Sequence, residues 1–267
     1  MEKKNPFNLV ASKKSRFILP NLLTIIGVCL GISSIKFALD DNYSLAVIFL
    51  VLAAILDALD GRIARLIKGT TEFGKELDSL TDFVSFGIAP AFILYFWELK
   101  NYGKVGWTIT LIFSVCCVLR LARFNLTKIS EDEEWKLNFF EGVPSPAGGI
   151  LVLTPLIVSV TSFDYITLNY DIIVPTFFIV TSLLLISKFP SYSLKKIVIQ
   201  RKATIFLLFG IILFFGLLLV YPFNVIAISS IIYLLMLPIS FFHYQKLKKQ
   251  NLDKNLGDDD DELEDVL

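Results

Sequence analysis

The sequence of 267 residues has little cysteine and almost no histidine. Its three cysteines, Cys29, Cys116 and Cys117, all lie in apolar stretches, and no pair has metal-ligand spacing. This usage argues against a disulfide framework or a thiolate zinc site. The single histidine, His243, lies far along the chain from the aspartates discussed below, and no P-loop or dinucleotide fingerprint occurs. Ser-His nucleophilic chemistry and the common nucleotide-binding motifs are therefore not expected.

An excess of charge of either sign is also missing, because 25 basic and 25 acidic residues give a formal net charge of zero. The basic residues are spread between apolar segments, so no nucleic-acid partner is expected. Residues 1–18 are polar and basic without a short apolar core, which argues against a removed signal peptide. Residues 258–262 read D-D-D-D-E, a block that predicts a solvated and disordered end of the chain.

Long apolar runs dominate the rest of the sequence. Hydrophobic residues make up 55% of the chain, above the roughly 45–50% of soluble domains. Runs of about 20 apolar residues, which are candidate spanning helices, occur at about 19–39, 44–66, 78–97, 105–124, 146–162, 171–188, 203–221 and 224–242. We therefore predict an all-α polytopic membrane protein, a helical bundle of about eight transmembrane helices. The predicted domains are a cytoplasmic juxtamembrane segment at 1–18, a transmembrane catalytic domain at 19–242 and an acidic tail at 243–267.

Lysine and arginine in the connecting segments set the orientation of a membrane protein. With the N-terminus in the cytoplasm, every basic residue except Lys36, Lys100 and Lys104 falls on the inner side. We therefore predict that both termini are cytoplasmic, which requires an even number of spans. The loop between the second and third spans is then cytoplasmic as well.

Four aspartates, Asp57, Asp60, Asp78 and Asp82, lie in or beside two of the apolar runs. An ionisable residue in such a run costs about 2.5–3.5 kcal/mol on insertion scales, so these residues are expected to have a function. Helical periodicity places Asp57 and Asp60 on one face of the second predicted span. Asp78 and Asp82 likewise share one face of the third span, and the short connecting loop allows the two faces to meet.

Carboxylate oxygens are the ligands that Mg²⁺ prefers, commonly together with substrate phosphates. Four carboxylates are enough for two ions about 3.5–4 Å apart, which would clamp a phosphoryl group. Small residues that leave room for a ligand, and an arginine suited to phosphate, lie on the same faces: Gly61, Ala64, Gly74 and Arg65. The pattern favours metal-dependent phosphate chemistry over the alternative of unrelated intramembrane acids in a transporter.

The complete pattern D-x₂-D-G-x₂-A-R-x₈-G-x₃-D-x₃-D, from Asp57 to Asp82, resembles the signature of the CDP-alcohol phosphatidyltransferases at every specified position. The resemblance implies a homodimeric membrane enzyme with a six-helix core. Such an enzyme transfers a phosphatidyl group from a CDP-linked lipid to an alcohol and releases CMP. The resemblance also implies that the four aspartates hold two Mg²⁺ or Mn²⁺ ions and that Asp82 is the general base. The positions that match the family's CDP-lipid site are Gly61, Ala64, Arg65 and Gly74.

Further segments resemble the phosphatidylserine synthase branch of this family, of the integral-membrane type. They are L-P-N-L-L-T at 19–24, R-L-A-R-F-N at 120–125 and F-E-G-V-P-S-P-A-G-G at 140–149, where Val143 replaces an expected leucine. This resemblance implies CDP-diacylglycerol and L-serine as substrates, and a bacterial inner membrane as the location. The candidate serine ligands are Arg120, Arg123, Asn125 and Ser145. Anchoring of a helix end explains each arginine equally well.

Two rival functions stay open on the sequence. Another transferase of the same family, using glycerol 3-phosphate, inositol or an amino alcohol, would keep the same aspartates, because they serve the donor and not the acceptor. A cation transporter would instead spread ionisable groups near mid-membrane over several helices. The acyl or isoprenoid nature of the lipid and the physiological metal are open as well.

Overall fold

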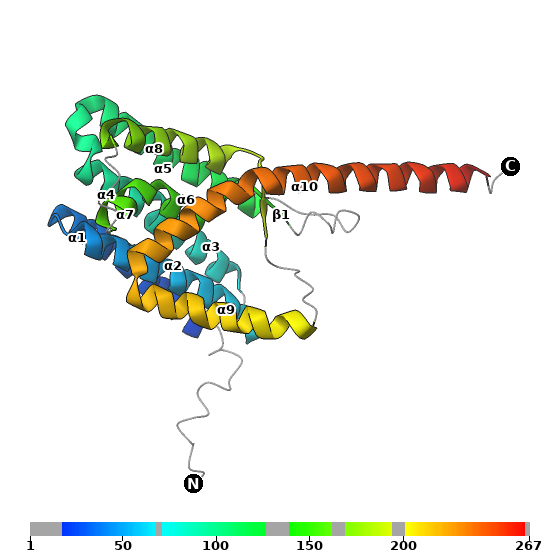
Figure 1. The fold of residues 1–267 in the computed structure, drawn as a ribbon, viewed down its shortest axis with the longest axis horizontal. Helices are drawn as coiled ribbons and strands as arrows, with labels where there is room; N and C mark the ends of the chain where they lie inside the picture. Colours follow the sequence, from blue (N-terminus) through cyan, green and yellow to red (C-terminus); the bar gives the residue numbers. More distant parts are fainter. Residues whose placement is uncertain (1–17, 68–70, 127–138, 162–168, 194–200, 265–267) are drawn as a thin grey trace, which may run out of the picture. The chain divides into compact units, whose positions relative to one another are not determined.

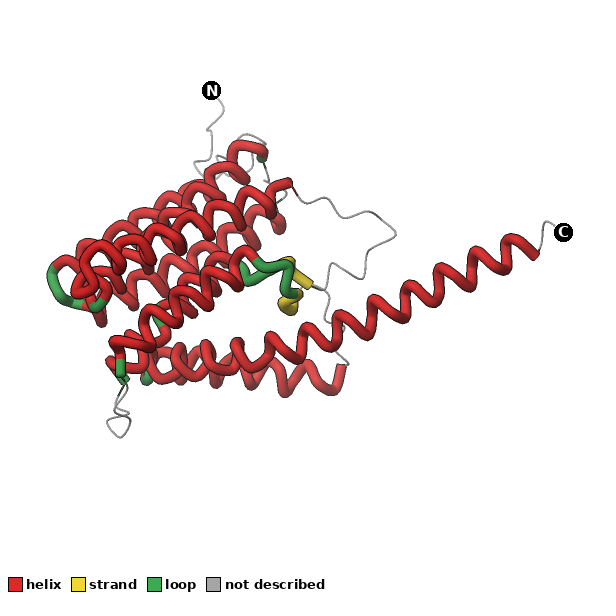
Figure 2. The backbone as a smooth tube through the Cα atoms, turned by 90° about the horizontal axis from the view of Figure 1, so that it is seen from above, coloured by secondary structure: helices red, strands yellow, loops and turns green. Residues whose placement is uncertain are grey.

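The computed structural model describes residues 18–67, 71–126, 139–161, 169–193 and 201–264, with side chains left out at 201–204 and 251–264. Figure 2 shows that these residues are almost entirely helical, with two short strands. Five helical segments are long and apolar enough to cross a membrane: Ile18–Leu39, Tyr43–Leu66, Glu72–Trp97, Leu99–Leu126 and Pro222–Gln250. The predicted all-α polytopic membrane fold is confirmed, and the chain is an integral membrane protein.

The chain forms two compact units, and the first comprises Met1–Thr127 with Pro144–Ile186. It is built only from helices in the residues that are described. In chain order (Figure 1) they are α1 (Ile18–Leu39), α2 (Tyr43–Leu66), α3 (Glu72–Asp82), the π-helix η2 (Phe83–Ile88), α4 (Ala89–Trp97), the 3₁₀-helix η3 (Leu99–Tyr102), α5 (Gly103–Leu126), α6 (Ser145–Val152), α7 (Thr154–Val160) and α8 (Tyr170–Ile186).

Side-chain caps define where the two aspartate-bearing helices begin. Asn42 Oδ1 accepts a hydrogen bond from the Leu45 N–H at 3.3 Å at the start of α2. Thr71 Oγ1 accepts one from the Gly74 N–H at 3.0 Å at the start of α3. Such N-caps typically contribute about 1 kcal/mol. The Thr71 cap therefore fixes the start of the helix that carries Asp78.

A π-helix follows Asp82 without a break in the helical path. In η2 the chain widens, so that the Ala89 N–H bonds to the Val84 carbonyl, five residues earlier. Pro90 comes next, and it cannot continue the regular ladder because proline has no N–H. Short π-turns of this kind are uncommon and often lie at functional sites.

Glycines allow three other helices to approach η2 closely. A Cβ added at Gly31 of α1 would lie 2.5 Å from Ser85 Oγ and 3.0 Å from Ser85 Cα. A Cβ at Gly149 of α6 would lie 3.1 Å from the Phe86 carbonyl oxygen. One added at Gly87, in η2 itself, would lie 3.0 Å from Cys117 Sγ on α5. Small residues are the usual means of close helix packing in membranes, so η2 is held tightly between α1, α5 and α6.

The second compact unit comprises Lys128–Val143 and Ser187–Leu267. Strand β1 (Phe139–Glu141) pairs with β2 (Pro190–Tyr192) in antiparallel fashion, and the helices α9 (Arg201–Val220) and α10 (Pro222–Glu264) follow. The Tyr192 hydroxyl lies 2.9 Å from His243 Nδ1 of α10. The Phe139 ring stacks on Tyr192, so a small aromatic cluster joins this hairpin to α10.

The eight predicted apolar runs are helical wherever the structure describes them, but they are not equally long. Tyr170–Ile186 and Ile205–Val220 are shorter apolar helices, and the run at 146–162 is divided between α6 and α7, with Pro155 at the start of α7. The number of eight spans therefore stays a prediction. The predicted domain boundaries also stay a prediction. The predicted boundary between the transmembrane domain and the acidic tail, at residues 242 and 243, falls inside helix α10, which runs from Pro222 to Glu264. Lysine, glutamine and leucine at 245–250 are strong helix formers and favour this continuation.

Replacing Gly31 by alanine should destabilise the protein, because the new methyl group would meet Ser85 at the contact between α1 and η2. Overpacking of this kind costs about 1–3 kcal/mol, which exceeds the gain in helix propensity. The melting temperature in detergent measures the effect. Gly216→Ala in α9 is the control, since a Cβ there meets nothing within 4 Å. Equal melting temperatures for the two variants would contradict the close packing.

Candidate active site

Three of the four predicted aspartates come together on two helices. Ligand oxygens of Asp57 and Asp60 on α2 and of Asp78 on α3 all lie within 4.8 Å of one another. Asp60 is buried, whereas Asp78 is exposed. The two predicted carboxylate faces therefore meet, as expected from the helical periodicity and the short connecting loop.

The fourth aspartate, Asp82, lies deeper and has its own partners. Its carboxylate is close enough to that of Asp57 for a direct interaction. Ser145 Oγ donates a hydrogen bond to Asp82 Oδ2 at 2.8 Å, and Arg120 Nη1 donates to Ser145 Oγ at 2.8 Å. The other carboxylate oxygen, Oδ1, is buried and accepts no hydrogen bond from the described residues. Ser145 therefore holds one oxygen of Asp82, while the buried Oδ1 accepts no hydrogen bond from a described donor and the Asp57 carboxyl group is a close neighbour.

Thr24 of α1 is a site residue that the aspartate pattern did not identify. Its hydroxyl is buried and lies 2.6 Å from Asp60 Oδ2 and 3.0 Å from the Pro20 carbonyl oxygen. A hydroxyl has one proton, and donation to a carboxylate is the stronger of the two bonds. Thr24 is the last residue of the L-P-N-L-L-T segment, which the sequence analysis singled out. Nothing in the sequence indicated that Thr24 would contact Asp60.

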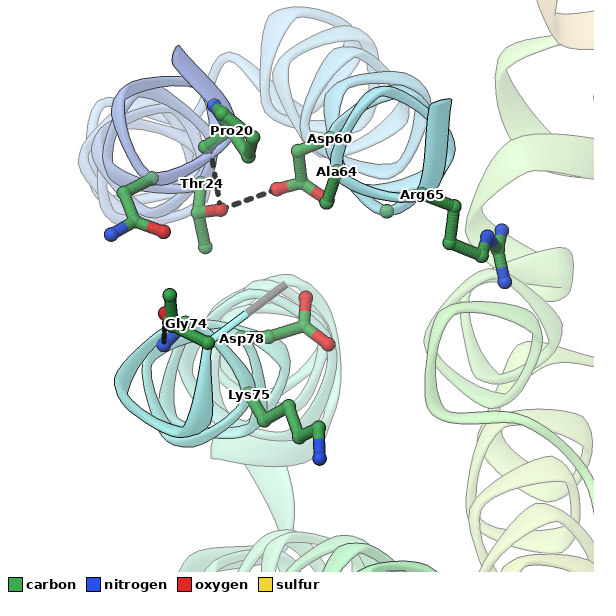
Figure 3. A pocket seen from close by; sticks show the side chains of 11 residues that line it. Pro20, Thr24, Asp60, Ala64, Arg65, Gly74, Lys75 and Asp78 are labelled. Atoms are coloured by element: carbon green, nitrogen blue, oxygen red, sulfur yellow. Dashed lines mark hydrogen bonds between the residues drawn. The ribbon is translucent and has the colours of Figure 1, made fainter. Parts of the chain in front are cut away.

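A pocket of about 250 Å³ opens beside the aspartates. Its lining comes from the start of α1, the end of α2 and the start of α3: Pro20, Asn21, Thr24, Asp60, Gly61, Ala64, Arg65, Thr71, Gly74, Lys75 and Asp78. Figure 3 shows Asp60 and Asp78 facing the same space between these helices, with Arg65 and Lys75 extending from its rim. The predicted donor-site residues Gly61, Ala64, Arg65 and Gly74 therefore all line one pocket with two of the aspartates.

The two glycines of the pocket differ in the space beside them. A Cβ added at Gly61 would meet nothing within 4 Å, so this part of the wall is open to a ligand. A Cβ added at Gly74 would lie 3.2 Å from Asn21 Oδ1 and 3.1 Å from Thr71 Oγ1. The missing side chain at Gly74 therefore allows Asn21 to pack closely against it and leaves little free space for a ligand.

The residues present fit divalent cations. Ligand oxygens of Asp57, Asp60 and Asp78 lie together, Asp82 is a neighbour of Asp57, and Arg120, which is 6% exposed, is a buried cation close to Asp82. Hard divalent cations take several oxygen ligands, and an uncompensated group of buried carboxylates is strongly unfavourable. The mutual proximity of Asp57, Asp60 and Asp78 is the feature that a bound cation would satisfy.

The four candidate serine ligands have different hydrogen-bond partners among the described residues. Arg120 and Ser145 are linked to Asp82 by the two hydrogen bonds described above. Arg123 instead donates to the carbonyl oxygens of Ile186 at 2.6 Å and Leu185 at 3.4 Å, at the end of α8. Asn125 Nδ2 donates to Ser79 Oγ at 3.0 Å. Arg123 has the contacts of a helix-end cap, so its role toward a substrate stays a prediction.

A second, apolar hollow of about 580 Å³ adjoins the pocket. It is lined by Ile18, Asn21, Leu22, Ile25, Thr71, Phe73 and Leu77. Asn21 and Thr71 line both spaces, so the polar pocket and the apolar hollow are neighbours. The arrangement suits a ligand with a charged head and an apolar chain.

Comparison with known proteins agrees with this chemistry. The model of the CDP-alcohol phosphatidyltransferase family matches residues 17–242. A Helicobacter pylori protein named CDP-diacylglycerol–serine O-phosphatidyltransferase is 32% identical over 219 residues, which are 82% of this chain and 89% of that protein. Proteins of the same name from Mycobacterium leprae and Bacillus subtilis are 44% identical over 137 residues and 33% identical over 147 residues. The match to the Mycobacterium leprae protein covers 51% of this chain and 45% of that protein, so the chain spans about half of its length. The match to the Bacillus subtilis protein covers 55% of this chain and 76% of that protein.

Replacing Thr24 by valine should weaken metal binding without abolishing the fold, because valine keeps the shape but cannot donate to Asp60. Hydrogen bonds to charged groups are worth about 1.5–3 kcal/mol, so the Mn²⁺ concentration needed for thermal stabilisation should rise at least about tenfold. Thr24→Ser keeps the hydroxyl and should behave like the unaltered protein. An unchanged Mn²⁺ midpoint in Thr24→Val would show that this bond does not orient Asp60.

Proposed function

This chain belongs to the CDP-alcohol phosphatidyltransferase family, and from that membership we propose that it transfers the phosphatidyl group of CDP-diacylglycerol to the hydroxyl of L-serine, with release of CMP. The names of the relatives support serine as the acceptor. The observation that carries the proposal is the group of three aspartates beside Asp82, whose buried Oδ1 accepts no hydrogen bond from a described donor.

The pocket and the adjoining hollow support a lipid-linked nucleotide as the donor. Arg65 can pair with the diphosphate, and the open space at Gly61 admits a group against the helix backbone. The apolar lining of the neighbouring hollow, including Leu22 and Phe73, suits an acyl chain. The nucleotide head then lies in the polar pocket while the lipid chain stays in apolar surroundings.

Asp57, Asp60, Asp78 and Asp82 are the residues that would hold two Mg²⁺ or Mn²⁺ ions. When bound, such ions neutralise a diphosphate and polarise the phosphorus under attack. Thr24 orients Asp60 through its hydroxyl. The fit of the residues is the basis for this assignment, together with the match of all four aspartates to the family pattern.

In the proposed reaction, Oδ1 of Asp82 accepts the proton from the hydroxyl of the substrate L-serine. The serine oxygen forms a bond to the β-phosphorus, and the bond from that phosphorus to the oxygen of CMP breaks. Arg65 offsets the charge that develops on the departing CMP. Direct transfer is favoured because the sequence offers no Ser-His or Cys-His pair that would activate a covalent nucleophile.

The distribution of lysine and arginine supports a cytoplasmic position for this site. The pocket lies where α1 starts, α2 ends and α3 starts, and these three helix ends flank the basic segments at 1–18 and 62–75. L-Serine and CMP, which are water-soluble, would then reach the site from the cytoplasm. We also propose that the protein is a homodimer and that it lies in a bacterial inner membrane.

The release of CMP by the purified protein tests the acceptor. The protein in detergent receives CDP-diacylglycerol with Mg²⁺ or Mn²⁺, and serine, glycerol 3-phosphate and inositol are offered separately. We expect release with serine alone. Release with a different alcohol would overturn the serine assignment but keep the family chemistry, and no release with any alcohol would contradict the proposed reaction.

Replacing Asp82 by asparagine should reduce turnover by at least about a hundredfold, because the amide cannot accept the proton and general-base catalysis contributes roughly 10²–10⁴-fold. Binding of the CDP-lipid should remain measurable, since the pocket that holds its head does not include Asp82. Turnover and CDP-lipid binding are measured on the same preparation. Near-normal turnover would remove Asp82 from the role of base.

A further inference from the structure

We infer that Ser145 and Arg120 position Asp82 for its reaction and do not bind the acceptor amino acid. This inference rests on the proposed role of Asp82 as base. It reassigns two residues that sequence resemblance offered as serine ligands, and it rests on the chain of hydrogen bonds from Arg120 through Ser145 to Asp82.

The Ser145 hydroxyl both donates and accepts a hydrogen bond inside the protein. It is completely buried, its single proton is donated to Asp82 Oδ2, and its oxygen accepts a hydrogen bond from Arg120 Nη1. A hydroxyl has one donor proton, so Ser145 could donate to a substrate only by releasing Asp82. Donation from Ser145 to the carboxylate of a substrate would therefore disturb the base that the reaction needs.

Arg120 is set to act on Asp82 and not on a ligand from outside. Its side chain is almost wholly buried, and its guanidinium carbon lies 5.3 Å from the centre of the Phe124 ring, one turn further along α5. This ring contact and the bond to Ser145 fix the orientation of the guanidinium group. The bond from Arg120 to Ser145 links a fixed positive charge to the hydroxyl that holds Asp82 Oδ2.

The backbone around Ser145 gives this arrangement rigidity. Pro144 and Pro146 flank Ser145, and proline fixes the φ angle at both positions. Helix α6 begins at Ser145, and Gly149, one turn on, packs against Phe86 of η2, the segment that directly follows Asp82. The bond from Ser145 to Asp82 thus joins two segments that are themselves in close contact. One consequence is that Oδ2 is held and Oδ1 is the oxygen presented to the acceptor.

Steady-state kinetics separate a positioning role from a binding role. Ser145→Ala should lower kcat by about 10- to 100-fold, because a misplaced catalytic group costs rate, and should leave the KM for serine within about twofold. Ser145→Thr restores the hydroxyl and should recover most of kcat. If Ser145 binds the acceptor, Ser145→Ala would instead raise the KM for serine with little change in kcat, and this result would overturn the inference.

Arg120→Gln gives a second and independent test. Glutamine can still donate to Ser145 but carries no charge. A positioning role predicts a lower kcat with an unchanged KM for serine, whereas loss of a partner for the serine carboxylate would raise that KM at least about tenfold. The second outcome would overturn the inference even if Ser145→Ala fails to fold.

Two controls keep this test separate from the proposed function. Ser182→Ala removes another buried serine hydroxyl, one that donates to the Phe178 carbonyl in α8 and has no contact with Asp82, and it should leave both kinetic constants unchanged. The unaltered protein is assayed first with each alcohol. If it uses an alcohol other than serine, the proposed acceptor is wrong, and the same split between kcat and KM measured with that alcohol still tests the roles of Ser145 and Arg120.

Discussion

Carboxylates gathered in membrane-spanning helices need compensation, and this electrostatic constraint governs the structure around α2 and α3. The aspartates range from exposed Asp78 to buried Asp60, and the buried oxygens need a donor or a cation. Thr24 serves Asp60, and Ser145 with Arg120 serves one oxygen of Asp82. The oxygens left over are the ones suited to metal and to the transferred proton. In the proposed function, the oxygens held by Thr24 and Ser145 position the carboxylates, and the chemistry falls to the others.

These compensating groups come from three other helices, which explains why the packing is so close. Thr24 belongs to α1, Arg120 to α5 and Ser145 to α6. Short hydrogen bonds between separate helices require that the helices approach without intervening side chains. Gly31 and Gly149 provide that approach at η2. Packing and chemistry are therefore coupled, because a helix pushed outward by a larger residue would carry its donor away from the carboxylate.

The sequence predicted those features that follow from local periodicity. Helical spacing placed the aspartates on two faces, and the short loop between the helices brought these faces together, as the distances among Asp57, Asp60 and Asp78 show. The bonds to Thr24 and Ser145 could not be predicted in this way, because they join residues 36 and 63 positions apart along the chain. The π-turn at η2 also escaped prediction, since regular helix periodicity was assumed throughout the third apolar run. Hydropathy located the run at 146–162 but did not predict its division between α6 and α7.

The π-turn has a consequence for how this helix can evolve. A π-turn is equivalent to one extra residue inserted into an α-helix, so it shifts the angular phase of everything beyond it. The half before η2 presents Asp78 to a polar pocket, while α4, the half after it, buries Ala91, Ile93 and Leu94 in apolar packing. Deleting one residue in Phe83–Ile88 would restore a regular helix and rotate the two halves by about 100° relative to each other. Such a deletion would therefore change the direction in which Asp78 and Asp82 face relative to α4.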